Sequence, residues 1–274
     1  MDDGNELSLD DTSALRHLTG RLANLAVQND LTHTDIANQA INLFNTRQSG
    51  NAVRLDPGLI RGLIKIVFAD CIWLKVKEHE ESNEEYREME KNRKTANDRG
   101  IELLHMCFIS LLSPSKEVQN QAFSATCDIL PLMSIRTQNR KFNSLCTRMV
   151  NFINQNIFDA PSDEHCDTLD IGQRQLYLTA FCKLIMCRRV NIEYATHIFV
   201  RYISDYDTYG EIIKQTMTKA KSFDLVGTSE TMLRALCEKY ETLLAQRDGP
   251  LRVGDFNILK GDKERVIDSK EPQK

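Results

Sequence analysis

The sequence contains little of what builds tight turns, membrane spans or polycations. Its 274 residues include only 12 glycines and 6 prolines, which disfavours turn-dense all-β folds. No apolar run reaches the roughly 18 residues that a membrane span needs. The 35 lysines and arginines are outnumbered by 39 acidic residues, which gives a formal net charge of −4. Any contact with nucleic acid must therefore come from a local basic patch rather than from the charge of the whole chain.

Motifs for catalysis and metal binding are missing from the sequence as well. It has no glycine-rich phosphate loop, no G-x-S-x-G and no H-E-x-x-H. The six histidines are dispersed, and neither His105 with Cys107 nor His165 with Cys166 supplies more than half of a metal site. We therefore expect no metal, no cofactor and no enzymatic activity. An α-helical enzyme remains an alternative that would need a convergent polar pocket.

The cysteines and the start of the chain both indicate a reducing compartment. None of the eight cysteines forms a C-x-x-C pair, and most lie on apolar stripes, so we expect small buried side chains. The first six residues are acidic and lack the basic and apolar regions of a signal peptide. We expect a protein of the cytosol or nucleus. The cysteines are Cys71, Cys107, Cys127, Cys146, Cys166, Cys182, Cys187 and Cys237.

Apolar residues recur every three to four positions along most of the chain, which predicts amphipathic helices. Asp56 and Pro57 predict the N-cap and first residue of a helix whose wide apolar stripe indicates burial on most sides. Thr208 and Glu211 have the spacing of a capping box that opens a later helix. The stripes cover residues 15–25, 36–44, 59–72, 101–111, 118–132, 142–153, 177–185, 195–202, 212–217 and 232–244.

About ten helices without a convincing strand predict an all-α fold. Successive helix pairs favour an α-solenoid of antiparallel pairs, HEAT-like, in which each pair buries one face on its neighbours. A globular bundle is the alternative. We expect an acidic disordered start at 1–10, the helical array at 11–247 and a disordered charged tail at 248–274. Within the array, the charged stretch 78–99 is interpreted as a solvated helical face and 158–170 as an exposed loop.

Basic side chains form three clusters that suggest a ligand. In a solenoid the helix ends line up along one edge, so basic residues of separate pairs would form a stripe for phosphates. Ordinary surface solvation explains the same residues, because lysines are favourable near helix C-termini. The DNA-binding candidates are Arg136, Arg140, Lys141 and Arg148, then Lys183, Arg188 and Arg189, then Lys214, Lys219 and Lys221.

Three tyrosines, Tyr202, Tyr206 and Tyr209, form an aromatic cluster. Aromatic side chains often anchor a partner in an interface, so these are candidates for partner binding. The alternative is that they fill the corner between two helices.

Three blocks of sequence match a known family in order and spacing. The first reads V-Q-N-Q-A-F from Val118 and C-D-I-L from Cys127, the second A-F-C-K-L-I from Ala180, and the third Y-D-T-Y-G-E-I-I-K-Q-T-M-T-K from Tyr206. The family reads V-K-E-Q-A-F, C-D-I-L, A-A-F-C-K-L-I and Y-N-D-Y-G-D-I-I-K-E-T-M-S-K. Weaker matches near residues 15–18 and Trp73 extend the likeness. Most of residues 12–246 thus resembles a middle stretch of the stromalin (stromal antigen) family, the HEAT-repeat subunit of cohesin.

The resemblance implies a non-catalytic, nuclear and chromosome-associated α-solenoid. Stromalins bind the kleisin subunit of the cohesin ring, contact DNA and act in sister chromatid cohesion and chromosome segregation. The implied partners are the kleisin, other cohesin components and the DNA backbone without sequence specificity, and no membrane. The alternative is a truncated stromalin-like adaptor or regulator that does not join the ring. After Arg247 the family continues with helices, whereas Asp248, Gly249 and Pro250 lead here into a different tail, so a shortened paralogue, an isoform and a gene fragment all stay open.

Overall fold

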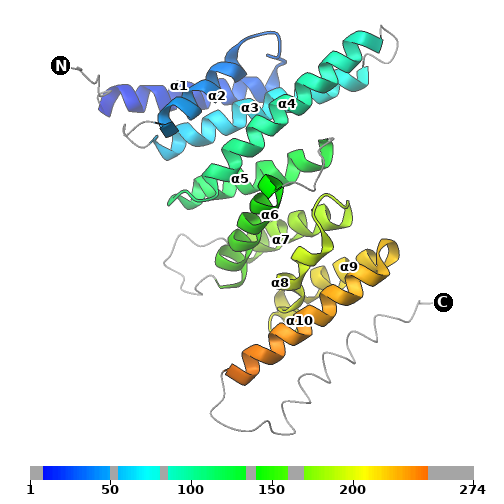
Figure 1. Ribbon diagram of the computed structural model, residues 1–274. Helices are drawn as coiled ribbons and strands as arrows, with labels where there is room; N and C mark the ends of the chain where they lie inside the picture. The colour runs from blue at the N-terminus through cyan, green and yellow to red at the C-terminus, as the bar shows by residue number, and fades with distance from the viewer. Residues whose placement is uncertain (1–8, 50–54, 81–85, 134–139, 160–169, 246–274) are drawn as a thin grey trace. The chain divides into compact units, whose positions relative to one another are not determined.

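The computed structural model describes residues 9–49, 55–80, 86–133, 140–159 and 170–245 (Figure 1). Within these ranges it contains ten α-helices and three short 3-10 or π turns, with no β-strand. The prediction of an all-α fold with about ten helices is confirmed. The chain divides into two compact units, residues 1–139 and 140–274. None of the described helices has the length and apolar character to cross a membrane.

The first unit is built around one central helix, α3, which the other helices contact. Asp56 caps α3 as the sequence predicts, because its side chain accepts the backbone N–H of Leu59 at 3.1 Å. Most apolar residues of α3 are buried, Ile64 and Val67 completely, and Ile60, Phe68 and Ile72 are half-buried, so the prediction of burial on most sides is confirmed. The helices are α1 (Leu9–Gln28), α2 (Ile36–Ser49), α3 (Pro57–Glu80), α4 (Tyr86–Ser110) and α5 (Lys116–Ile129).

Within this unit α1 and α3 lie side by side and run in the same direction. A Cβ atom at Gly62 would come within 2.7 Å of Thr19 Cγ2, and further along both helices the Trp73 indole N–H donates to the Ala26 carbonyl at 2.9 Å. Near the starts of α3 and α5, Arg61 forms an ion pair with Glu117. Side-by-side α1, α3 and α5 are compatible with stacked helix pairs.

The expected leucine stripe of α1 is not its buried face. Leu18 and Leu25 are 60% and 52% exposed, whereas Thr19, Ala23 and Ala26 are buried. Small residues allow the backbones of α1 and α3 to approach closely, so that Leu15 and Leu22 lie half-buried beside the contact and Leu18 and Leu25 turn toward solvent.

The charged stretch 78–99 spans the end of α3 and the beginning of α4, with residues 81–85 outside the described part. Most of its described side chains on α4 are exposed, as expected of a solvated face. Arg99 is the exception, because its Nε lies 2.9 Å from Asp70 Oδ2 in a nearly buried ion pair. The sequence pattern did not reveal this pair, which joins two helices.

The second unit differs from the sequence prediction at two helix starts. α9 begins at Tyr206 after an N-cap residue, Asp205, whose side chain makes no capping bond. The predicted capping box at Thr208 and Glu211 is therefore wrong. The expected helix at 195–202 is a four-residue α8 preceded by the 3-10 turn η3 (Ile192–Ala195). The helices are α6 (Arg140–Ile153), α7 (Ile171–Met186), α8 (Thr196–Phe199), α9 (Tyr206–Phe223) and α10 (Leu225–Ala245).

Most of the segments that the sequence assigns to a disordered start, an exposed loop and a charged tail fall outside the described residues. Leu9 and Asp10, assigned to the start, belong to α1. Asp170, assigned to the end of the loop, is the N-cap of α7 and accepts the backbone N–H of Gln173 at 2.7 Å.

Candidate nucleic-acid interface

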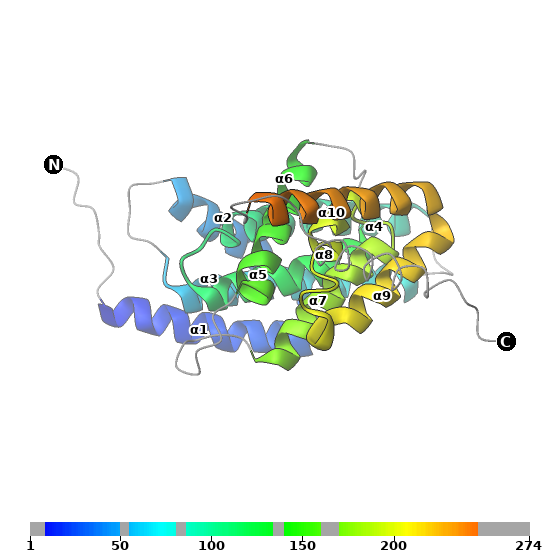
Figure 2. The same cartoon turned by 90° about the horizontal axis from the view of Figure 1, so that it is seen from below.

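Two helices of the second unit bring their C-terminal ends to the same place. Near their starts, the Gln175 side-chain amide of α7 donates to the Thr208 carbonyl of α9 at 2.9 Å. Beyond the end of α7, the Arg188 guanidinium donates to the carbonyl of Phe223, the last residue of α9, at 3.2 Å. The two helices are therefore parallel neighbours that end together, as both views show (Figure 1, Figure 2).

The first turn of α6 lies at that end as well. α6 runs antiparallel to α7, because the rings of Phe152 and Tyr177 meet edge to face with centroids 5.9 Å apart, late in α6 and early in α7. At the other end, the Tyr194 hydroxyl, in the turn after α7, donates to the Asn143 carbonyl of α6 at 3.3 Å. We call this end of the unit the basic end. Its cations are Arg140, Lys141, Lys183, Arg188, Arg189, Lys219 and Lys221.

Besides Arg188, four of these cations are exposed, and none of the four has an ion pair with a described acidic residue: Arg140, Lys141, Lys183 and Lys219. Two helix C-termini add partial negative charge at this end, which favours the lysines there. Two exposed acidic side chains, Glu193 and Asp224, belong to the same region and offset part of the positive charge.

Arg188 is held in place at the basic end by two contacts. Its backbone adopts a left-handed conformation with φ of +57°, where the chain turns after α7. Besides its bond to the Phe223 carbonyl, its guanidinium lies 4.8 Å from the centre of the Phe223 ring. The charge is thus held at a defined place by one hydrogen bond and one cation–π contact.

The remaining basic candidates are placed differently. Lys214 is half-buried near the middle of α9, and Arg148 is half-buried two turns into α6, where burial lowers the pKa of its guanidinium. Arg136 lies outside the described residues. One basic residue is not among the predicted candidates, namely Arg234 of α10, whose guanidinium lies 3.8 Å from the Glu193 carboxylate. It lies inside an apolar stripe, and no sequence signal set it apart.

The tyrosine candidates are mostly inaccessible. Tyr202 and Tyr209 are 5% and 4% exposed, and the Tyr209 hydroxyl donates to the Ile157 carbonyl at 3.3 Å. Tyr206 is 37% exposed, with its ring edge against Tyr202 at 5.5 Å between centroids. A partner reaching this cluster would meet chiefly Tyr206.

The cysteines offer no reactive centre in the core. Five of the seven described cysteines are buried, whereas Cys187 and Cys237 are exposed, contrary to the expectation of buried side chains throughout. Burial raises the pKa of the Cys107, Cys146 and Cys182 thiols to about 12, so these thiols stay protonated at neutral pH. Among the described residues, no three His, Cys, Asp or Glu side chains lie close enough to hold a metal ion. The chemistry that the basic end can perform is therefore the binding of anions by its lysines and arginines.

Comparison with known proteins agrees with the resemblance found in the sequence. No protein-family model matches the chain. Cohesin subunit SA-3 of Rattus norvegicus is 25% identical over 272 residues, which cover 91% of this chain and 21% of the relative. Cohesin subunit SA-1 of Xenopus laevis is 30% identical over 192 residues, 62% of this chain and 15% of the relative. Cohesin subunit SA-3 of Homo sapiens is 28% identical over 180 residues, 59% of this chain and 15% of the relative. The chain thus resembles stromalin subunits of cohesin and spans about a fifth or less of their length.

Proposed function

We propose that the chain is a non-catalytic helical scaffold of the cohesin type that acts in the nucleus, on chromosomes. The similarity to cohesin subunits over up to 91% of the chain supports this assignment. The array of packed helices suits it too, because stacked helix pairs present long surfaces to extended partners. Its protein partner in this proposal is the kleisin subunit of the cohesin ring, together with other cohesin components.

Co-purification tests the protein partner directly. We expect the tagged full chain, expressed in cells with an intact cohesin complex, to recover the kleisin. Recovery of no ring component would overturn membership of the ring and favour the alternative, an adaptor or regulator that acts outside it. A cytoplasmic location of the tagged chain would favour the same alternative.

The second part of the proposal is that the basic end binds the DNA backbone without reading sequence. The single observation that carries it is that members of three sequence-distant basic clusters meet at one end of the second unit, where the hydrogen bonds of Arg188 and Tyr194 join the helices. Exposed lysines and arginines neutralise phosphates and release counterions whatever the base sequence. The chain as a whole is acidic, so the binding depends on where these cations lie.

Charge reversal tests the basic end. We expect Lys183→Glu combined with Lys219→Glu to weaken binding of a fluorescent DNA duplex at least tenfold in anisotropy titrations at low salt. Both side chains are exposed, so folding should survive, and circular dichroism checks it.

The matched control reverses two exposed lysines of the first unit, Lys94→Glu and Lys116→Glu. Both variants change the net charge equally, so only the position of the change differs between them. Equal weakening by the two variants, or no weakening by either, would overturn the proposed interface.

A further inference from the structure

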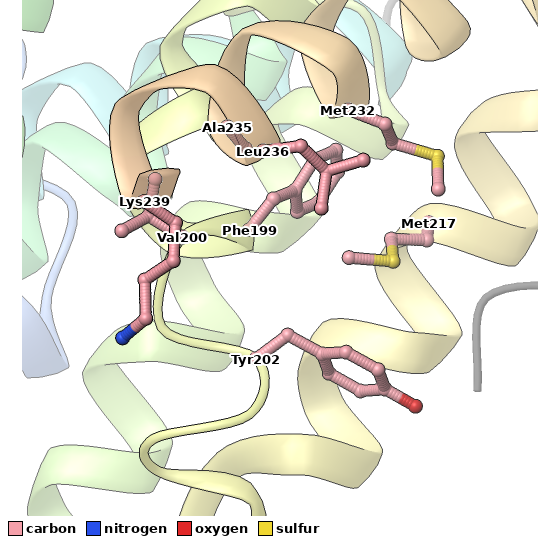
Figure 3. A pocket seen from close by; sticks show the side chains of 8 residues that line it. All are labelled: Phe199, Val200, Tyr202, Met217, Met232, Ala235, Leu236 and Lys239. Carbon is pink, nitrogen blue, oxygen red and sulfur yellow. The ribbon is translucent and has the colours of Figure 1, made fainter. Parts of the chain in front are cut away.

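An apolar hollow lies in the second unit between the end of α8, the middle of α9 and one side of α10. It is a half-open hollow, and the space in it, counted together with the solvent at its mouth, is about 380 Å³. In the close view, Met217 of α9 and Leu236 of α10 point into a common space, and the Lys239 ammonium lies at the rim and points away (Figure 3). The lining residues are Phe199, Val200, Tyr202, Met217, Met232, Ala235, Leu236 and Lys239. We call this site the α10 hollow.

The apolar surface continues from the hollow onto the outer side of α10. Val226, Leu233 and Leu244 are 69%, 62% and 41% exposed, and with Cys237 they recur at spacings of seven, four and seven residues along the helix. Such spacing puts them on one face. A stripe of large exposed apolar side chains beside an apolar hollow marks a surface that a partner segment covers.

We propose that this chain's own residues 251–259 fold back along α10 and occupy the hollow with Phe256. The segment has the complementary chemistry, because it carries Leu251, Val253, Phe256, Ile258 and Leu259 within nine positions. It follows α10 directly in the chain, so docking costs little loop-closure entropy compared with capture of a separate molecule. This docking does not depend on DNA or kleisin binding.

The connection is long enough for this return. The lining residues Met232 to Lys239 precede the last residue of α10, Ala245, by 13 to 6 positions, which is about 9 to 20 Å along the helix axis. Residues 246–256 span up to about 36 Å when extended. Gly249 and Pro250 follow α10 closely and are residue types that favour a reversal of the chain.

The charges agree with an antiparallel return. Asp255 directly precedes Phe256, so an anchored Phe256 brings this carboxylate to the rim, where Lys239 lies. Arg252, four residues nearer to α10, then runs toward the C-terminal end of the helix, where Glu241 is exposed. Both tail charges thus meet charges of opposite sign.

Methionine methyl spectra of the full chain test the docking. The chain has eight methionines, and an aromatic ring in the hollow would shift the methyl signals of Met217 and Met232. We expect Phe256→Ser to move both signals, while those of Met106 and Met149, buried in other helices, stay in place. Met217→Leu and Met232→Leu variants assign the signals. The matched control, Val266→Ser, lies beyond the proposed segment and should change neither.

Two outcomes would overturn the proposal. One is that Phe256→Ser leaves the Met217 and Met232 signals where they were. The other is that their positions depend on protein concentration, which would identify a second copy as the occupant. As an independent arm, Lys239→Glu should move the two signals toward those of Phe256→Ser, and adding Asp255→Lys should move them back. A double variant without this recovery would overturn the contact between Asp255 and Lys239.

Discussion

Asp30, in the turn after α1, is held by two side chains at once. The Lys77 ammonium lies 2.8 Å from Asp30 Oδ2, and the Thr32 hydroxyl and backbone N–H donate to Oδ1 at 2.6 and 3.0 Å. Burial by itself would raise the pKa of this carboxyl, but the bonds from Lys77 and Thr32 outweigh it and lower the pKa from 3.8 to about 2. The charged form is therefore the one that the fold stabilises.

Replacing Asp30 by Asn should destabilise the protein in a pH-dependent way. Since the folded-state pKa is below the unfolded one, the stabilisation is complete above about pH 4 and is lost as the pH falls through about 2. After allowance for solvent screening of a side chain that is one-third exposed, we expect a loss of about 1–2 kcal/mol at pH 7. Urea unfolding of the wild-type protein and of Asp30→Asn at pH 7 and pH 2.5 measures this loss. If the two proteins differ in free energy of unfolding by the same amount at both pH values, the lowered pKa of Asp30 is contradicted.

The ion pair of Asp70 and Arg99 differs from that of Asp30 and Lys77, because both of its partners are nearly buried. Their side chains are 9% and 15% exposed, and Arg99 also donates to Asn38 Oδ1 at 2.7 Å. Removing one partner leaves the other charge without compensation in the core. We expect Asp70→Asn to lower the free energy of unfolding by about 3–5 kcal/mol, measured by urea denaturation.

An exposed pair provides the control for this prediction. Arg93 and Glu90 lie 2.6 Å apart on α4 with half-exposed side chains, so Arg93→Gln should cost less than about 1 kcal/mol. Replacing both buried partners, Asp70→Leu with Arg99→Leu, should cost less than Asp70→Asn alone, because no buried charge then remains. If the double variant is the less stable of the two, the interpretation fails.

At the scale of elements, the contact between α1 and α3 makes two glycines respond oppositely to the same substitution. A Cβ at Gly20 of α1 would meet no atom within 4 Å, whereas a Cβ at Gly62 of α3 would lie 2.7 Å from Thr19 Cγ2. Alanine in a helix interior is favoured over glycine by about 1 kcal/mol. Overpacking a tight contact costs about 1–3 kcal/mol.

We therefore expect Gly20→Ala to raise the free energy of unfolding by about 0.5–1 kcal/mol. Gly62→Ala should lower it, because Thr19 is β-branched, buried and has little freedom to move. Thermal and urea unfolding of the two variants side by side measures the difference. Stabilisation by both substitutions would mean that α1 and α3 are not in close contact.

The sequence predicts an element well where a single local pattern, such as an N-cap or an apolar stripe, determines its start or its buried face. The cap and stripe of α3 depend on local chemistry and on burial from all sides, so both could be foreseen. The buried face of α1 could not be foreseen, because periodicity does not distinguish its leucine side from its alanine side. The alanine side is buried because small residues on α3 allow close contact there. The basic end depends on contacts between residues 35 and 51 positions apart, and no local pattern contains that information.

At the scale of the whole molecule, the distribution of charge matters more than its sum. With a net charge of −4, the chain as a whole does not attract DNA, and long-range repulsion weakens with salt just as phosphate contacts do. Salt dependence therefore reports how many cations meet phosphates. Besides Arg188, whose guanidinium is held by the carbonyl and ring of Phe223, the exposed cations of the basic end are Arg140, Lys141, Lys183 and Lys219.

If each of these four meets one phosphate, the logarithm of the affinity for duplex DNA should fall with the logarithm of the salt concentration at a slope of about −4. Neutralising two of them, Lys183→Gln with Lys219→Gln, should flatten the slope to about −2 and weaken binding equally for duplexes of unrelated sequence, since phosphate contacts carry no base information. Anisotropy titrations between 25 and 200 mM salt measure both quantities. An unchanged slope would mean that DNA is bound elsewhere on the chain, and a sequence-dependent loss would mean that bases are read. Either result would separate the basic end from the binding that it is proposed to explain.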